Sequence, residues 1–172
     1  RGYAPIQGGP ARDPGVVAWT GDTNNEWQAR RMAVYAAQID RMDQNIGKVL
    51  DAIRRTHAEN NTLIMFLADN GGCAEEVNRG KKGVPAGDKD SFFSYGLPWA
   101  NASNTPFRLY KHWDHEGGIS TPFIAYWPAV IRASGAPGSQ NPARTGNGGT
   151  LCKQVGHIID VMATCVDVAG AT

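Results

Sequence analysis

The sequence is short of cysteine and contains no long apolar run. Its three cysteines are an odd number without a C-x-x-C pair, which predicts neither a zinc site nor a closed disulfide framework. No stretch approaches the roughly 18 consecutive apolar residues of a membrane-spanning helix, and the N-terminus has no apolar signal core. A globular chain that does not bind membranes is therefore expected.

An excess of charge of one sign and the common nucleophile motifs are missing as well. The 17 Lys and Arg residues against 16 Asp and Glu residues give a net charge of +1. Such a balance creates no long-range field that would attract nucleic acid, so no nucleic-acid partner is expected. There is also no G-x-S-x-G nucleophile elbow and no glycine-rich phosphate loop of the Walker type.

The apolar pattern predicts three elements after an irregular lead-in over residues 1–22. Apolar residues at steps of three and four predict a helix with one buried stripe over about residues 25–56, opened by a T-x-x-E capping box. The continuous run TLIMFLA predicts a strand covered on both faces of a mostly parallel sheet. IIDVMATCVDVAG predicts a last helix that ends at Gly170.

Two long polar segments, over about residues 71–106 and 131–150, are predicted to be loops. Loops of this length in compact domains are usually functional or mobile. Between them, TPFRLYKHW and STPFIAYWP predict two short strands separated by a tight turn at Gly117-Gly118. No internal repeat and no second domain is visible, which indicates a single α/β domain.

The polar residues directly after the apolar strand are the first candidates for a site. Asp69 and Asn70 offer a carboxylate and an amide oxygen, the donors that Ca²⁺ and Mg²⁺ prefer. The carboxyl ends of parallel strands are also the usual ligand crevice of open α/β sheets. Asn-Gly and Asp-Gly are common turn formers, so a plain turn is the alternative. A hard cation needs six or more oxygens, so most of its ligands would come from elsewhere.

The second candidate cluster is YKHWDHEGG, in which Lys, His, Asp and Glu are crowded together. A Lys and a His could hold a tetrahedral oxyanion and protonate its leaving group. Crowding favours Lys111 and His115 for these roles, although each could also be an exposed loop charge. None of the cysteines has a His partner by motif, and Cys152 and Cys165 are expected in the core.

Four ordered blocks over about residues 19–170 resemble the arylsulfatases of the alkaline-phosphatase superfamily. They are MAVYAAQIDRMDQNIGKVL, NTLIMFLADNGGCAE, SYGLPWANASNTPFRLYKHWDHEGGISTPFIAYWP and HIIDVMATCVDVAG. The resemblance implies a partial alkaline-phosphatase-like sulfatase fold, with a mostly parallel sheet flanked by helices and the N-terminal half absent. Residues 1–172 would then be a single partial domain with a core over 23–172. A small-molecule sulfate ester as substrate and a periplasmic or secreted location are also implied.

The same resemblance implies a role for each candidate residue. Asp69 and Asn70 match the Asp-Asn pair that holds the family's metal, usually Ca²⁺, with Mg²⁺ as the alternative. Lys111 matches the sulfate-binding lysine, and His115 occupies the slot directly before Glu-Gly-Gly. The C/S-x-P-x-R motif, whose Cys or Ser becomes the formylglycine nucleophile, is missing from the chain. The chain alone is therefore expected to be inactive.

Two other functions fit the same residues. One metal and one lysine suit a phosphate or phosphonate ester as well, so a phosphoester or phosphonate hydrolase of the same superfamily is an alternative. A non-catalytic domain that retains the fold as a binding module is another. In each case half a sheet would expose apolar edges, and we expect the chain to self-associate through the exposed sheet edge.

Overall fold

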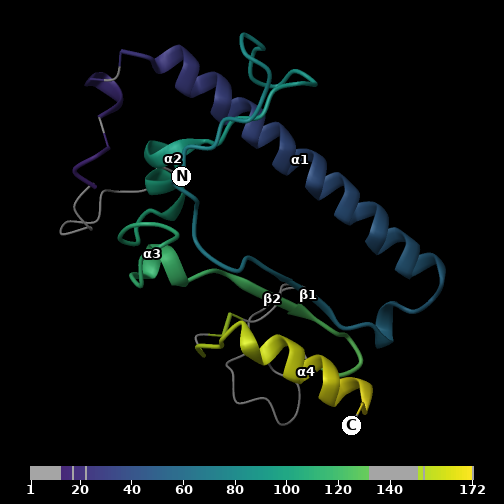
Figure 1. Ribbon diagram of the computed structural model, residues 1–172. Coiled ribbons are helices and arrows are strands. Elements are labelled where there is room, and N and C mark those ends of the chain that lie inside the picture. The colour runs from purple at the N-terminus through teal and green to yellow at the C-terminus, as the bar shows by residue number, and fades with distance from the viewer. Residues whose placement is uncertain (1–12, 17, 22, 132–150, 153, 172) are drawn as a thin grey trace. The chain divides into compact units, whose positions relative to one another are not determined.

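The computed structural model describes residues 13–16, 18–21, 23–131, 151–152 and 154–171 (Figure 1). Four α-helices, two 3-10 helices and two strands lie within these ranges. In chain order they are η1 (Trp19–Gly21), α1 (Asn25–Arg55), η2 (Glu59–Asn61), β1 (Ile64–Leu67), α2 (Gly96–Asn104), α3 (Glu116–Ile119), β2 (Phe123–Tyr126) and α4 (Ile159–Ala169). Among these elements, no helix is both long and apolar enough to cross a membrane.

The chain divides into two compact units. One unit comprises Arg1–Ala58 and Met65–Ile124, and it contains α1, α2, α3 and every candidate residue of the site. The other comprises Glu59–Ile64 and Ala125–Thr172, and it contains η2 and α4.

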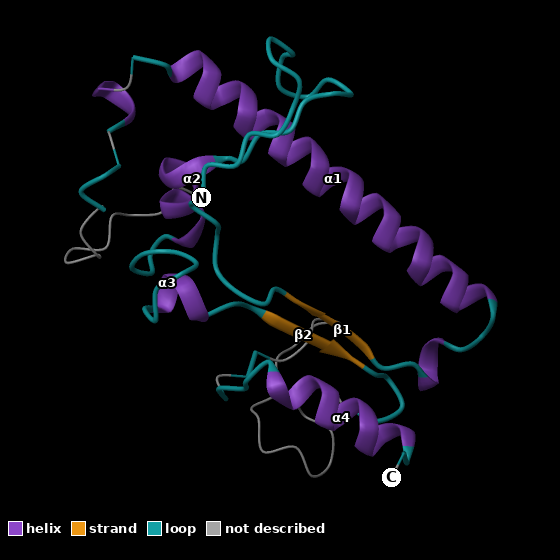
Figure 2. Ribbon diagram, viewed as in Figure 1, coloured by secondary structure: helices purple, strands orange, loops and turns teal. Residues whose placement is uncertain are grey.

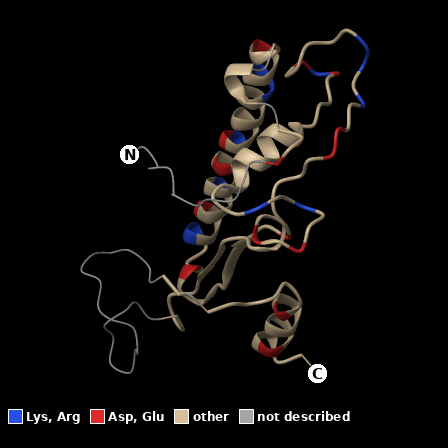
Figure 3. Cartoon of the chain, turned by 90° about the vertical axis from the view of Figure 1, so that its left-hand side faces the viewer, with Lys and Arg blue, Asp and Glu red and all other residues tan. Residues whose placement is uncertain are grey.

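The long helix predicted over residues 25–56 is confirmed as α1, but the predicted capping box is wrong. The helix begins at Asn25, and its N-cap residue Asn24 forms no side-chain capping bond. At the other end, Arg54 and Arg55 occupy the last turn, where positive charge interacts favourably with the helix dipole. Figure 3 shows charges of both signs along α1, as expected for a solvated polar face.

The apolar stripe of α1 is less buried than predicted. Large apolar side chains along it remain open to solvent, from 37% exposed at Tyr35 to 61% at Val49. The aromatic contacts of the helix lie towards its N-terminal half, where Trp27 meets Phe93 edge to face and Tyr35 stacks on Tyr95. The helical period correctly identified the apolar face, but the described residues do not cover all of it.

The strands predicted in TLIMFLA and STPFIAYWP are confirmed as β1 and β2, which pair in a two-stranded sheet (Figure 2). Thr121, before β2, donates to the carbonyl oxygen of Ala68, after β1. The amide of Ala129, after β2, donates to the carbonyl oxygen of Asn60, before β1. These contacts show that the two strands run antiparallel, so the mostly parallel sheet stays a prediction. Full burial of the strands is wrong for this chain, since Phe66 is 46% exposed.

Two predictions for residues 105–119 are wrong. TPFRLYKHW forms bends rather than a strand, with Leu109 and His112 at positive φ, 62° and 100°. Gly117 and Gly118 lie inside the short helix α3 rather than in a tight turn. The segment 71–106 is also more ordered than a single loop, because it contains α2 and an antiparallel bridge between Asn78 and Phe93.

The last helix is confirmed as α4, and it ends as predicted at Gly170 in the left-handed region with φ 63°. Cys152 and Cys165 are both exposed, so their assignment to the core is wrong. The predicted loop over 131–150 lies outside the described residues except for Ile131. The same holds for residues 1–12 of the lead-in, while η1 occupies part of the remainder.

Substitutions on the exposed stripe of α1 test whether it drives self-association. We expect the wild-type chain to sediment as oligomers, because exposed apolar patches promote association. Ile39→Lys with Val49→Lys should shift it towards monomer. Ala33→Lys with Ala37→Lys adds the same two charges at exposed positions off the stripe and should leave the oligomers intact. Sedimentation velocity is the measurement, and a monodisperse wild-type monomer would contradict the expectation.

Candidate functional site

Asp69 and Asn70 lie in a bend directly after β1, as predicted. Asp69 is exposed, and its carboxylate makes no hydrogen bond or ion pair with any described residue. Asn70 is half-buried, and its Nδ2 donates to the carbonyl oxygen of Gly71 at 3.2 Å. This bond leaves the Oδ1 of Asn70 as the side-chain atom available to a cation.

Close packing of backbone fixes the turn that follows. The amide of Gly71 donates to the carbonyl oxygen of Gly118 at 2.9 Å, and a Cβ on Gly71 would overlap the carbonyl oxygen of Gly117. A Cβ on Gly117 would in turn overlap the carbonyl oxygens of Arg108 and Leu109. Glycine is required here because only a residue without a side chain permits such an approach.

Lys111 is joined to the same turn. Its amide donates to the carbonyl oxygen of Gly72 at 2.9 Å. Its Nζ lies 3.9 Å from Oε1 of Glu75, in an ion pair whose side chains are 40% and 63% exposed. An exposed pair of this kind contributes little stability and separates easily. Sequence reasoning missed Glu75, although its acidic charge and its place in NGGCAEE were visible.

His115 is bonded to the same region through its backbone. It is the N-cap residue of α3, and its carbonyl oxygen accepts the amides of Gly118 at 2.7 Å and Ile119 at 3.1 Å. Its ring is half-buried and forms no hydrogen bond with Asp69, Asn70 or Lys111, all of which are described. The structure therefore brings the backbone segments of all four predicted residues together, but no side-chain hydrogen bond or ion pair joins any two of them.

Asn104, at the end of α2, is a residue of the site that sequence reasoning missed. Its Oδ1 accepts the amide of Gly72 at 3.0 Å, and its Nδ2 donates to the carbonyl oxygen of Leu109 at 3.2 Å. The only signal in the sequence was its position just before Thr105-Pro106, where a helix is expected to end.

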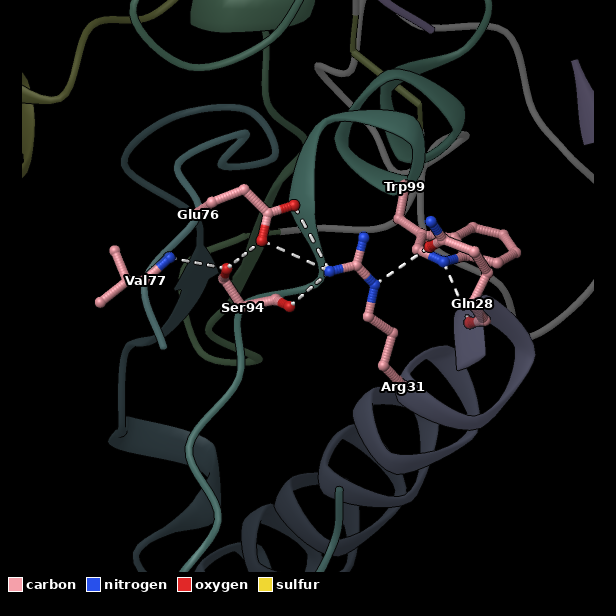
Figure 4. A network of polar contacts seen from close by, with 6 residues as sticks. All are labelled: Gln28, Arg31, Glu76, Val77, Ser94 and Trp99. Carbon is pink, nitrogen blue, oxygen red and sulfur yellow. Dashed lines mark hydrogen bonds and ion pairs between the residues drawn. The ribbon is translucent and has the colours of Figure 1, made fainter. Parts of the chain in front are cut away.

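A buried arginine holds the residue that follows Glu75. Arg31, on α1 and 8% exposed, donates to the carboxylate of Glu76 at 3.4 and 3.5 Å and to the carbonyl oxygen of Ser94 at 3.3 Å (Figure 4). Ser94 in turn accepts the amide of Val77 at 2.9 Å. A buried guanidinium is tolerated because these acceptors replace the water it loses.

Two tyrosines near the turn stay neutral at pH 7. Burial raises the pKa of Tyr95, whose hydroxyl lies where a Cβ on Gly72 would be. Burial also raises the pKa of Tyr110, and the hydrogen bond from its hydroxyl to Asp13 at 3.1 Å adds to the rise. Both hydroxyls therefore stay protonated, and that of Tyr110 donates to Asp13.

The donors at the turn suit a hard cation in kind but not in number. Asp69 and Asn70 supply oxygens, which match Ca²⁺ or Mg²⁺. Within the described ranges, however, no group of three or more His, Cys, Asp or Glu residues could hold a metal ion. Since Ca²⁺ takes six to eight ligands, these two residues fit as one side of a metal site.

The sequence matches the family model named Sulfatase over residues 9–171. The chain belongs to the sulfatase family. The resemblance inferred from the four sequence blocks is thereby confirmed. Membership places this sulfatase chain in the alkaline-phosphatase-like α/β fold, of which the described residues show helices and a small two-stranded sheet.

Several curated sulfatases are similar to this chain. An uncharacterized sulfatase of Schizosaccharomyces pombe is 34% identical over 138 residues, covering 72% of this chain and 25% of the relative. The arylsulfatase of Klebsiella aerogenes is 36% identical over 121 residues, covering 62% and 26%. The human N-acetylgalactosamine-6-sulfatase is 26% identical over 138 residues, covering 80% and 20%. The sulfatase chain thus spans about a quarter or less of the length of these relatives.

Two glycine-to-alanine substitutions test the close packing at the turn. Gly71→Ala should lower the free energy of unfolding by about 1–3 kcal/mol, because the new Cβ forces Gly117 away. Gly47→Ala places the same methyl group within α1, where nothing lies within 4 Å, and should raise stability by about 0.5–1 kcal/mol. Urea denaturation midpoints measure both. Equal midpoints for Gly71→Ala and wild type would show that the glycine contact is not formed.

Proposed function

We propose that this chain is part of a sulfuric ester hydrolase of the arylsulfatase type, and that Asp69, Asn70, Lys111 and His115 belong to its active site. Two hydrogen bonds support the proposal most directly. Lys111 N to Gly72 O and Gly71 N to Gly118 O bring the Asp-Asn turn against the segment that carries Lys111 and His115. In a member of the sulfatase family, residues of these types on neighbouring segments are what the proposed active site would need.

The turn would hold one side of the metal. Asp69 would contribute its carboxylate and Asn70 its Oδ1, and the remaining ligands would lie outside these residues. Ca²⁺ is the metal that we propose, with Mg²⁺ as the alternative. When bound, it supplies positive charge against the charge that develops on the sulfate group. The formylglycine nucleophile would likewise come from a part of the protein outside this chain.

The remaining two side chains would act on the sulfate ester itself. The ammonium of Lys111 would donate hydrogen bonds to the sulfate oxygens, and donors placed in this way commonly supply a large part of the rate enhancement. Breaking the ion pair between Lys111 and Glu75 would cost little free energy, because the pair is exposed. His115 would donate a proton from its imidazole to the oxygen of the leaving alcohol or phenol.

The same proposal implies a substrate, a location and further strands for the sheet. Its partner would be a small-molecule sulfate ester in the periplasm or outside the cell. The mostly parallel sheet would be completed by strands outside these 172 residues, and those strands and their helices would cover apolar side chains that are now exposed, such as Val49 and Phe66.

Replacing Lys111 tests its role in the complete protein, with the nucleophile formed. Lys111→Ala should lower kcat/KM for 4-nitrophenyl sulfate by about 100- to 1,000-fold, because a donor to the transferred group is lost. Lys82→Ala is the control, since Lys82 is exposed and makes no ion pair with a described residue. Full activity of Lys111→Ala would refute its assignment. Faster turnover of 4-nitrophenyl phosphate by the wild type would favour a phosphoester hydrolase instead.

The isolated chain gives a second test. Purified residues 1–172 should not turn over 4-nitrophenyl sulfate at any Ca²⁺ concentration, because the C/S-x-P-x-R motif is missing from this sequence. Product release is followed by absorbance, and the complete protein is the positive control. Catalytic turnover by the isolated chain would mean that these residues contain a nucleophile of another kind.

A further inference from the structure

One amide side chain connects the two segments of the candidate site. Asn104 is half-buried at the end of α2. Its Oδ1 accepts the amide of Gly72, three residues after Asp69, at 3.0 Å. Its Nδ2 donates to the carbonyl oxygen of Leu109, two residues before Lys111, at 3.2 Å. Both polar atoms of the side chain are therefore used, one on each segment.

Asparagine is well suited to this position. The contact needs an acceptor on one branch of the side chain and a donor on the other, and a neutral amide provides both. An ionised aspartate has the same shape but offers acceptors only, so it would keep the bond to Gly72 and repel the carbonyl of Leu109. Alanine would leave both backbone groups without this partner.

The bond to Leu109 also supports an unusual backbone conformation. Leu109 has a φ of 62°, in the left-handed region that non-glycine residues seldom occupy. Such a conformation persists only where surrounding contacts hold it. Asn104 holds the carbonyl of Leu109, and the amide of Gly117 holds the carbonyl of the preceding Arg108 at 2.9 Å. The direction of the backbone leading to Lys111 therefore depends on these two contacts.

Apart from the exposed ion pair of Lys111 with Glu75, the other bonds that the described residues form between the two segments are made by backbone atoms. They are Lys111 N to Gly72 O and Gly71 N to Gly118 O, both 2.9 Å. A substitution leaves their donors and acceptors in place, whereas Asn104 contributes through its side chain. From these contacts we infer that Asn104 is a positioning residue, which sets the distance between the metal-binding turn and Lys111. This inference rests on the proposed function, because it assigns that turn and Lys111 to one active site.

Hydrogen exchange of the 172-residue chain gives the first readout. In Asn104→Ala, amide exchange measured by mass spectrometry should become faster in peptides covering residues 69–75 and 107–113. Asn104→Asp should speed amide exchange more in the peptide covering 107–113 than in the one covering 69–75, because the bond to Gly72 is kept. Asn101→Ala is the matched control, with the same residue type one turn earlier on α2 and no side-chain hydrogen bond to a described residue. It should leave both peptides unchanged.

Metal binding and catalysis of the complete protein give the second readout. Asn104→Ala should weaken Ca²⁺ binding and lower kcat/KM for 4-nitrophenyl sulfate by about 10- to 100-fold, the usual effect of losing a residue that orients metal ligands. Asn104→Asp should fall between this variant and wild type, and Asn101→Ala should remain within about twofold of wild type, as expected away from such contacts. All assays are run well below the melting temperature of each variant, so that lost stability alone does not change them.

The outcomes separate this inference from the proposed function. If Asn104→Ala exchanges, binds Ca²⁺ and turns over substrate as the wild type does, the positioning role is wrong. If Asn101→Ala weakens Ca²⁺ binding and lowers kcat/KM as much as Asn104→Ala does, the effect belongs to α2 as a whole. The positioning role of Asn104 is then also wrong. If the wild-type protein hydrolyses no sulfate ester, the proposed function fails. Amide hydrogen exchange of residues 69–75 in Asn104→Ala then still decides whether the Asn104 side chain stabilises the turn.

Discussion

The approach of Gly71 to Gly117 and Gly118 is the constraint on which the site depends. Backbone lies directly on backbone there, with an amide-to-carbonyl bond of 2.9 Å and no space for a Cβ on either side. Two segments far apart in the sequence are thereby held in direct backbone contact. The polar residues next to these glycines lie near one another for that reason, and their own side chains contribute little to it.

Local patterns predicted the elements that depend on local physics. The 3.6-residue period located α1, the apolar run located β1, and a glycine able to adopt a left-handed conformation marked the end of α4. The period also identified the apolar face of α1, but it could not tell whether this chain contains the surface that covers that face. Tyr35 and Val49 are partly exposed, so the residues that the structure describes cover that face incompletely.

The wrong or missing predictions concern residues at which contacts between distant parts of the sequence override the local conformational preference. TPFRLYKHW is rich in residues that favour strands, yet bonds from Asn104 and Gly117 to successive carbonyls hold it in bends. The candidate residues Asp69, Asn70, Lys111 and His115 could be selected by residue type and family motif. Asn104 could not, because an asparagine before Thr-Pro looks like any helix end, and its two partners are visible only in three dimensions.

The ion pair with Glu75 weakens the attraction of Lys111 for any anion. An anion that approaches this lysine also approaches a carboxylate 3.9 Å from the same ammonium. The repulsion by Glu75 grows in proportion to the charge of the anion. A sulfate monoester carries one negative charge, whereas a phosphate monoester carries close to two at neutral pH. At the same position Glu75 repels the phosphate almost twice as strongly and Lys111 attracts it almost twice as strongly as well, so the pair by itself does not distinguish the two esters by charge.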